Sequence, residues 1–196
     1  MYNQGFNKFY WAFLFIMLNF RIQGVSLIPD IVGYCLLAWG FKTLMTKSIH
    51  FKKGFNFTIP LIFLSIFTIY EPPATEQWIV FNNALFLSAL LTIVYVGLNL
   101  YVVYCMFYGI IDMAKGMEKN GISSGAQKLW ETYLFLKLAM LVIYVLMIIP
   151  LIGLLFLIGY FVATIVVLVK IMKFIKETNI EFSNYDVETC NRDYLN

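Results

Sequence analysis

The sequence predicts an all-α fold: a polytopic membrane helix bundle of six transmembrane helices with both termini in the cytoplasm. Two observations lead to this prediction, the composition and the placement of the positive charges. Of the 196 residues, 61% are hydrophobic and 13% are charged, whereas a soluble domain carries about 25% charged residues. So little charge cannot cover a water-facing surface. The 18% of aromatic residues fits a chain with a lipid-facing shell and interfacial belts.

Six apolar segments follow one another along the chain, and each is expected to form a transmembrane helix. They are Phe6–Phe20, Leu27–Met45, Phe55–Tyr70, Trp78–Ile111, Leu129–Ile149 and Ile152–Ile175. The fourth would reach about 51 Å, well beyond the bilayer core of about 30 Å. We therefore expect the fourth helix to continue into the cytoplasm as far as about Lys119 rather than to break near Gly97. Asn120-Gly121 is a fitting stop signal, and Ser124–Gln127 resembles a capping box that would begin the fifth helix.

The positive charges lie in alternate connections between these segments. One side carries Lys8, Lys42, Lys47, Lys52, Lys53, Lys115, Lys119, Lys128, Lys170, Lys173 and Lys176. The other side carries only Arg21. The positive-inside rule therefore places both termini in the cytoplasm. Charge does not tell whether the first two helices cross fully or form a re-entrant hairpin, although Arg21 favours full crossing.

Two cytoplasmic segments have distinct compositions. The basic segment Lys42–Lys53 is expected to lie as a loop against anionic lipids, which attract each cation with about 1 kcal/mol. Residues 177–196 carry five acidic residues and one arginine without apolar periodicity. We call these residues the acidic tail and expect them to be disordered. Residues 1–176 then form a single transmembrane domain.

The stretch GVSLIPDIVGY, residues Gly24–Tyr34, places polar groups at the predicted start of the second helix. Ser26 is suited to cap this helix, and Asp30 in the first turn faces the positive end of the helix dipole. Arg21, on the other arm of the hairpin, can pair with Asp30. The alternative is that Arg21, Gln23 and Asp30 line an outward-facing polar pocket, because ionisable groups near membrane depth are functional candidates.

The same stretch carries a resemblance. Residues 9–44, FYWAFLFIMLNFRIQGVSLIPDIVGYCLLAWGFKTL, resemble the start of small, uncharacterised membrane proteins of Gram-positive bacteria. In those proteins a short first helix leads into a motif of the form G-x-x-x-L-P-D-[IF]-[IV]-G-Y. The matching residues are Gly24, Ile28 in place of leucine, Pro29, Asp30, Ile31, Val32, Gly33 and Tyr34. The resemblance implies a family type and carries no activity with it.

Further candidates lie inside the predicted helices. Asn99 is expected to form an interhelical hydrogen bond or to line a substrate path. Lys137 is expected to extend its stem to the interface or to pair with a buried anionic group. Small residues at helical spacing predict close helix packing. These packing candidates are Ser26, Gly33, Gly40, Ala84, Ser88, Gly159 and Ala163.

No motif in the sequence indicates catalysis, a cofactor, a metal site or nucleic-acid binding, and the single histidine, His50, lies in the lysine-rich segment. The expected function is that of a non-enzymatic integral protein of the bacterial cell membrane. It would be an accessory, regulatory or assembly subunit, with the bilayer and another membrane protein as partners. The alternative is a small transporter or substrate-binding component. Its size and helix number are similar to those of the substrate-binding components of energy-coupling-factor vitamin transporters, although the first helix has only Ala12 of their A-x-x-x-A pattern.

Overall fold

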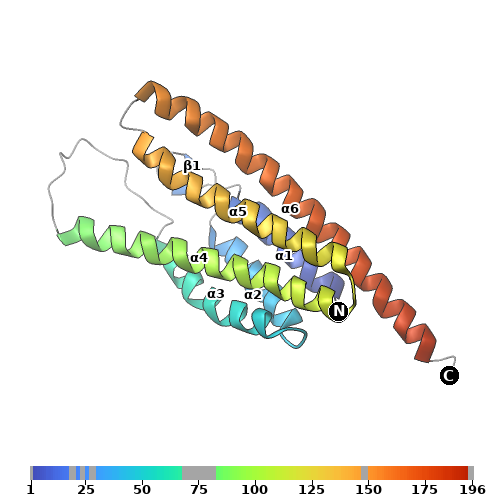
Figure 1. The fold of residues 1–196 in the computed structure, drawn as a ribbon. Coiled ribbons are helices and arrows are strands. Elements are labelled where there is room, and N and C mark those ends of the chain that lie inside the picture. The colour runs from blue at the N-terminus through green and yellow to red at the C-terminus, as the bar shows by residue number, and fades with distance from the viewer. Residues whose placement is uncertain are drawn as a thin grey trace.

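The computed structural model describes residues 2–17, 21–22, 25–26, 30–67, 83–146 and 150–193. Within these ranges the fold is all-α with six helices, as predicted (Figure 1). The helices are α1 (Tyr2–Met17), α2 (Asp30–Leu44), α3 (Ile49–Phe67), α4 (Asn83–Gly116), α5 (Asn120–Leu146) and α6 (Pro150–Asp193). Two strands of two residues each, β1 (Arg21–Ile22) and β2 (Val25–Ser26), pair antiparallel between α1 and α2.

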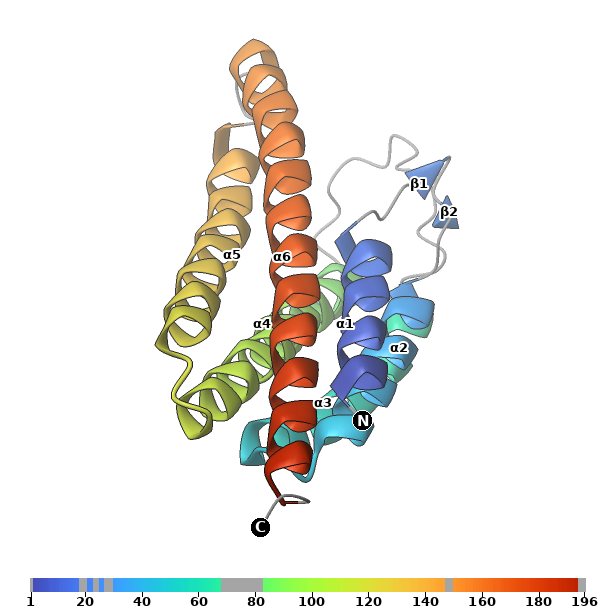
Figure 2. The same cartoon turned by 90° about the vertical axis from the view of Figure 1, so that its right-hand side faces the viewer.

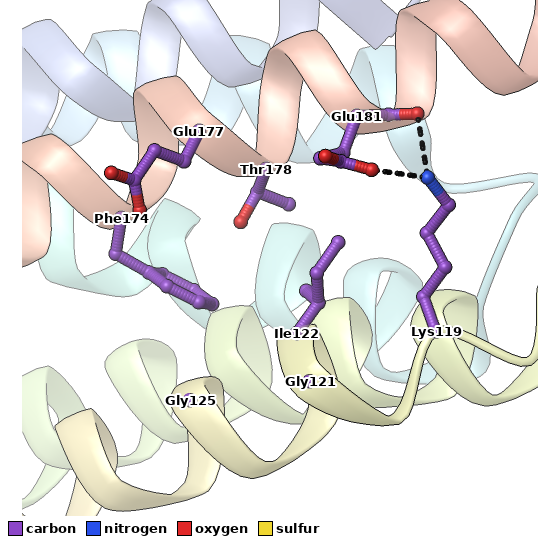
Figure 3. A pocket seen from close by; sticks show the side chains of 8 residues that line it. All are labelled: Lys119, Gly121, Ile122, Gly125, Phe174, Glu177, Thr178 and Glu181. Carbon is purple, nitrogen blue, oxygen red and sulfur yellow. Dashed lines mark hydrogen bonds and ion pairs between the residues drawn. The ribbon is translucent and has the colours of Figure 1, made fainter.

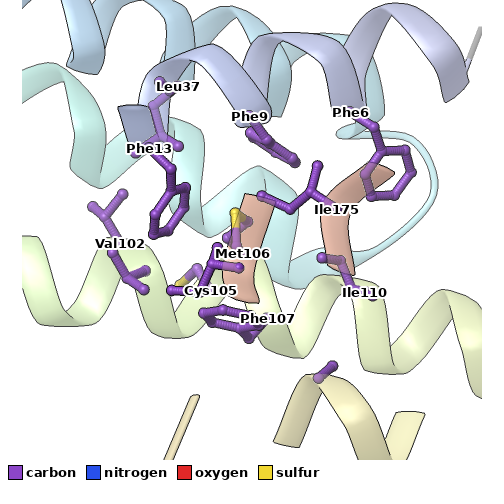
Figure 4. Close-up of a cluster of buried hydrophobic side chains, with 14 of the residues drawn as sticks. Phe6, Phe9, Phe13, Leu37, Val102, Cys105, Met106, Phe107, Ile110 and Ile175 are labelled. Atoms are coloured by element: carbon purple, nitrogen blue, oxygen red, sulfur yellow. The ribbon is translucent and has the colours of Figure 1, made fainter. Parts of the chain in front are cut away.

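The helices form a ring in chain order. Each helix packs against the next, and α6 returns to pack against α1. Both ends of the described chain lie at one end of the bundle, together with the α2–α3 and α4–α5 turns, and the β1–β2 pair lies at the other (Figure 2). Phenylalanines of α1 fill the centre of the ring, where they meet Val102 and Met106 of α4 and Ile175 of α6 (Figure 4).

Glycines bring α1 and α2 into close contact. A Cβ atom added at Gly33 would lie 2.6 Å from the side chain of Ile16, and one added at Gly40 would lie 2.6 Å from the ring of Phe9. Gly5 of α1 faces α2 in the same way. Two members of the predicted small-residue seam thus lie where the two helix backbones approach each other most closely. The side chain of the third, Ser26, lies outside the described part.

Helix α4 is one unbroken helix through Gly97 and past Tyr108. Helix α4 therefore continues past Ile111, where the predicted apolar segment ends, and this agrees with the expected extension. It ends at Gly116, three residues before the expected limit at Lys119.

The end of α4 and the start of α5 differ from the prediction for a local reason. Glu118 has a left-handed backbone with φ of 55°, a conformation that favours glycine. This bend lets the Lys119 amide donate to the Ala114 carbonyl at 2.8 Å, which closes the last turn of α4. Asn120-Gly121 consequently begins α5 instead of ending α4. The predicted capping box at residues 124–127 lies inside α5 and caps nothing.

The lysine-rich segment Lys42–Lys53 is mostly helical, which corrects the predicted loop. The turn between α2 and α3 is short, and α3 begins at Ile49. The Ser48 hydroxyl accepts a backbone N–H of the first turn at 3.1 Å, so Ser48 is the cap that starts this helix early. Lys52 and Lys53 therefore lie on α3.

Helix α6 continues through the acidic tail to Asp193, so the predicted disorder is wrong for most of that tail. The reason is a single aromatic side chain. Phe182 is fully buried, with its ring centroid 6.1 Å from that of Tyr2 and 5.6 Å from that of Phe6. Asn179 also donates to the Asn3 side chain at 3.0 Å. Contact with α1 holds the tail helical where its own sequence has no apolar periodicity.

Two helices within the described residues are long and apolar enough to cross a membrane. They are residues 90–116 of α4 and residues 153–185 of α6. The helices α1 and α2 have 16 and 15 residues. They reach about 24 and 22 Å, which is less than the bilayer core of about 30 Å.

We predict that Phe182→Ala detaches the tail from α1. Loss of a buried phenylalanine costs about 3–5 kcal/mol, so the thermal midpoint of the purified protein should fall and protease cleavage within the tail should accelerate. Ile180→Ala is the control, because Ile180 is exposed on the same helix. Equal cleavage rates in the wild-type protein and in the Phe182→Ala variant would contradict the proposed anchoring.

Candidate functional site

A chain of hydrogen-bonded side chains runs through the bundle and joins α2, α4 and α5. The Tyr133 hydroxyl donates to Asn99 Oδ1 at 2.9 Å, and Asn99 Nδ2 donates to the Tyr34 hydroxyl at 2.7 Å. The Tyr34 and Tyr95 hydroxyls are 2.8 Å apart. The Tyr95 hydroxyl donates to Asp30 Oδ2 at 2.9 Å. We call these five residues the polar chain.

The donors of the polar chain all point the same way. A tyrosine hydroxyl has one proton, and that of Tyr95 is given to Asp30. The bond between Tyr34 and Tyr95 must therefore be donated by Tyr34. Hydrogen bonds that follow one another in this way polarise each other. The chain thus directs successive dipoles towards the Asp30 carboxylate.

The polar chain is buried. Tyr34, Tyr133 and Asn99 are all less than 9% exposed, and Asp30 is 8% exposed. Burying such groups is unfavourable unless each finds a partner, and the chain supplies partners across three helices. Asp30 is also the first residue of α2, where the helix dipole favours a negative charge.

The structure joins two residues that the sequence analysis considered separately. Asp30 lies in the first turn of α2, as expected, but the expected cap Ser26 belongs to β2 and does not cap a helix that begins at Asp30. Asn99 forms interhelical hydrogen bonds, which is one of the two roles expected of it. The side chain of Arg21 and the whole of Gln23 lie outside the described residues. Their pairing with Asp30, and the pocket that the three would line, therefore stay predictions.

The sequence analysis missed the three tyrosines of the polar chain. A signal was present, because Asp30 and Tyr34 are four residues apart, as are Tyr95 and Asn99. Each pair therefore lies on one helix face. That the two faces meet depends on the register between α2 and α4, which no local pattern contains.

Lys137 lies beside the far end of the polar chain. It is half-buried, and its ammonium nitrogen lies 5.5 Å from the ring centroid of Tyr133. This distance is within the range of a cation–π interaction. The partner of Lys137 shown by the structure is thus an aromatic ring rather than an anionic group.

A second polar cluster ties the start of α3 to the end of α4. The Ser48 hydroxyl donates to Asp112 Oδ2 at 2.6 Å, and His50 Nδ1 lies 2.7 Å from the same oxygen. The His50 ring packs against Tyr104 and Tyr108. His50 is therefore held by Asp112 and by two tyrosine rings. Among the described residues, no group of three potential metal ligands comes together.

The remaining packing candidates have different surroundings. Ala163 is half-buried against the core. Gly159 is exposed, and a Cβ atom added there would meet none of the described residues within 4 Å. It therefore does not serve the expected packing within the described part of the chain. Ala84 and Ser88 belong to α4, but their side chains lie outside the described part.

No protein-family model, no curated protein and no solved structure matches this chain.

We predict that Tyr133→Phe destabilises the protein by about 1–3 kcal/mol, because it leaves the buried Asn99 carbonyl without its donor. Tyr160→Phe should have little effect, since that hydroxyl is bonded only to a methionine sulfur at 3.6 Å. Thermal unfolding in detergent measures both. If the polar chain is cooperative, Tyr133→Phe and Tyr95→Phe should couple by more than about 0.5 kcal/mol although the two residues share no bond. Simple additivity would show that the bonds are independent.

Proposed function

We propose that this chain is a non-enzymatic, multi-pass protein of the bacterial cell membrane. We propose further that it is an accessory, regulatory or assembly subunit that packs against another membrane protein. In this proposal all six helices cross the bilayer, both termini are cytoplasmic, and the lysines of segment Lys42–Lys53 contact anionic lipids.

The arrangement of the lysine-bearing ends supports this topology. Lys47 follows α2, Lys115 lies in the last turn of α4, and Lys119 lies in the α4–α5 turn. Both turns lie at the same end of the bundle as the N-terminus and the C-terminal end of α6 (Figure 2). Positive charge gathered at one end agrees with the positive-inside rule.

The observation that carries the subunit proposal is the exposure of one stretch of α6, residues 154–158, which lies far from this lysine-bearing end. The five consecutive residues Leu154–Ile158 are 43–66% exposed. Because a helix has about 3.6 residues per turn, these residues cover its whole circumference. A helix that packs in a bundle buries one stripe, and residues 154–158 bury none against the described residues. Residues 90–94 of α4 are likewise all exposed.

Gly159 supports a protein rather than lipid alone as the neighbour of this surface. Lipid tails cover leucine as well as glycine, so lipid contact does not require a small residue. A glycine with open space above it, followed four residues later by Ala163, permits the backbone of another helix to approach closely. The proposed partner surface is therefore the face of α6 around Gly159.

The second candidate, a small transporter or substrate-binding component, is favoured by a different observation. The polar chain directs its hydrogen bonds to one buried carboxylate, that of Asp30. Helix packing alone could use apolar side chains, which avoid the desolvation cost of a buried carboxylate. A ligand with N–H or O–H donors could replace the Tyr95 hydroxyl as a partner of this carboxylate.

We predict that Gly159→Leu abolishes the association without changing the stability of the isolated protein. A photoreactive amino acid in place of Phe156, which is 54% exposed, should form a discrete protein adduct in native membranes, and Gly159→Leu should remove that adduct. The control is Gly33→Leu, which must displace Ile16 and should lower the thermal midpoint. Adducts with lipid alone, or a protein adduct unaffected by Gly159→Leu, would overturn the subunit proposal.

The second candidate predicts a bound small molecule that depends on Asp30. Native mass spectrometry of the purified chain should then show an extra mass, and Asp30→Asn should remove it. The asparagine keeps an oxygen that can accept from Tyr95 but has no charge, so the bundle should remain folded. If neither the wild-type protein nor the variant carries an extra mass, no such ligand is bound at this carboxylate.

A further inference from the structure

A groove of about 640 Å³ lies between the start of α5 and the C-terminal part of α6 (Figure 3). It lies apart from both the polar chain and the exposed part of α6. Its α5 side includes Ile122, and Lys119 of the preceding turn closes one end. Its α6 side consists of Phe174, Glu177, Thr178 and Glu181.

Thr178 is the unusual residue of this groove. It is 1% exposed, and its hydroxyl oxygen has no hydrogen-bond partner within the described part of the chain. Other helical threonines donate to the carbonyl four residues earlier. These are Thr43, Thr58, Thr132 and Thr164. A buried hydroxyl without a partner is costly, and this one lines a groove, so it points to a group that occupies the groove.

The charges of the groove indicate the sign of that group. Glu177 and Glu181 are one turn apart on α6 and flank Thr178, whereas Lys119 is the cation among the lining residues. Lys119 already pairs with Glu181. Glu177 reaches Lys173 only at 3.8 Å and is 61% exposed. Among the lining residues, carboxylates therefore outnumber cations by one, which disfavours an anion.

We propose that this groove binds a primary ammonium group. Such a group has three N–H donors, which match the Glu177 carboxylate and the Thr178 hydroxyl oxygen as acceptors. The ring of Phe174, one turn before Thr178, supplies an aromatic face that attracts a cation. A quaternary ammonium group would satisfy the ring but would leave the hydroxyl and the carboxylate without hydrogen bonds.

Two sources carry this chemistry: the ethanolamine headgroup of a phospholipid and a free amine of the cytoplasm. In the proposed topology, Lys170, Lys173 and Lys176 mark the inner membrane surface on α6. The α6 side of the groove begins among these lysines at Phe174 and continues to Glu181, within reach of both sources.

The test measures the thermal midpoint of the full chain in phosphatidylcholine nanodiscs. Ethanolamine and putrescine are added as soluble probes, with choline as the quaternary control, and a parallel sample contains phosphatidylethanolamine. If the soluble amines raise the thermal midpoint, the occupant of the groove is a free amine. If only phosphatidylethanolamine raises it, the occupant is the lipid headgroup. No rise in any sample, or an equal rise with choline, would overturn the proposal.

Variants separate binding from folding. Thr178→Val keeps the side-chain shape and removes a hydroxyl that has no partner among the described residues, so the midpoint without amine should be unchanged or higher. Affinity for the amine should fall at least about tenfold, the loss expected for one charge-assisted hydrogen bond. Glu177→Gln should weaken binding similarly, and Thr132→Val, outside the groove, should not. A lower midpoint for Thr178→Val without amine, or an undiminished amine effect, would refute the assignment.

Discussion

The interaction on which the rest of the bundle depends is the hydrogen-bond chain from Tyr133 to Asp30. Four of its five members are buried and Tyr95 is half-buried, and a buried polar group is costly to leave without a partner. The chain therefore fixes how α2, α4 and α5 stand relative to one another. Sliding α4 by one turn would carry Tyr95 away from Asp30 and Asn99 away from Tyr34 at the same time. Apolar packing tolerates such shifts more easily, because one apolar side chain can replace another. The register of these three helices is thus set by polar groups, although most of the buried surface is apolar.

Packing is uneven along the bundle. Towards the end that carries both termini, aromatic rings of α1, α2 and α3 pack together, with Phe9 against both Phe41 and Phe51. Glycines also allow α1 and α2 to approach closely. Towards the other end, residues 90–94 and 154–158 are exposed on every side. The polar chain lies between these regions, since Tyr95 and Asn99 follow directly on the exposed part of α4. The same long helices are thus closely packed towards one end and, against the described residues, exposed towards the other. This division is why the subunit proposal rests on α6 and the ligand alternative rests on Asp30.

The sequence predicted the helix class, the order of the six helices, the long α4 and the position of Asp30 at a helix start. These features depend on apolar length, charge placement and local capping, all of which are visible along a single chain. Helix ends were less predictable because tertiary contacts decide them. Ser48 caps α3 and also donates to Asp112, far away in sequence. Glu118 adopts a left-handed backbone that its residue type does not favour. The sequence shows two parts of the polar chain, the pair Asp30 and Tyr34 and the pair Tyr95 and Asn99, each on one helix face. It does not show that the two faces contact each other, because that depends on the register of α2 against α4.

The acidic tail is the clearest case in which tertiary contacts, and not local sequence, decide the structure. It also explains how α6 closes the ring against α1. Composition predicted disorder because a charged segment without apolar periodicity cannot form a core of its own. The tail does not need a core of its own, because α1 provides aromatic side chains against which it packs. Ile175 meets the phenylalanines of α1 inside the ring (Figure 4), and Phe182 continues this contact two turns later against Tyr2 and Phe6. The last helix thus joins the first through the segment that looked least structured. Thr178 and the groove lie between these two contacts, so the proposed amine site is built on the part of α6 that holds the ring closed.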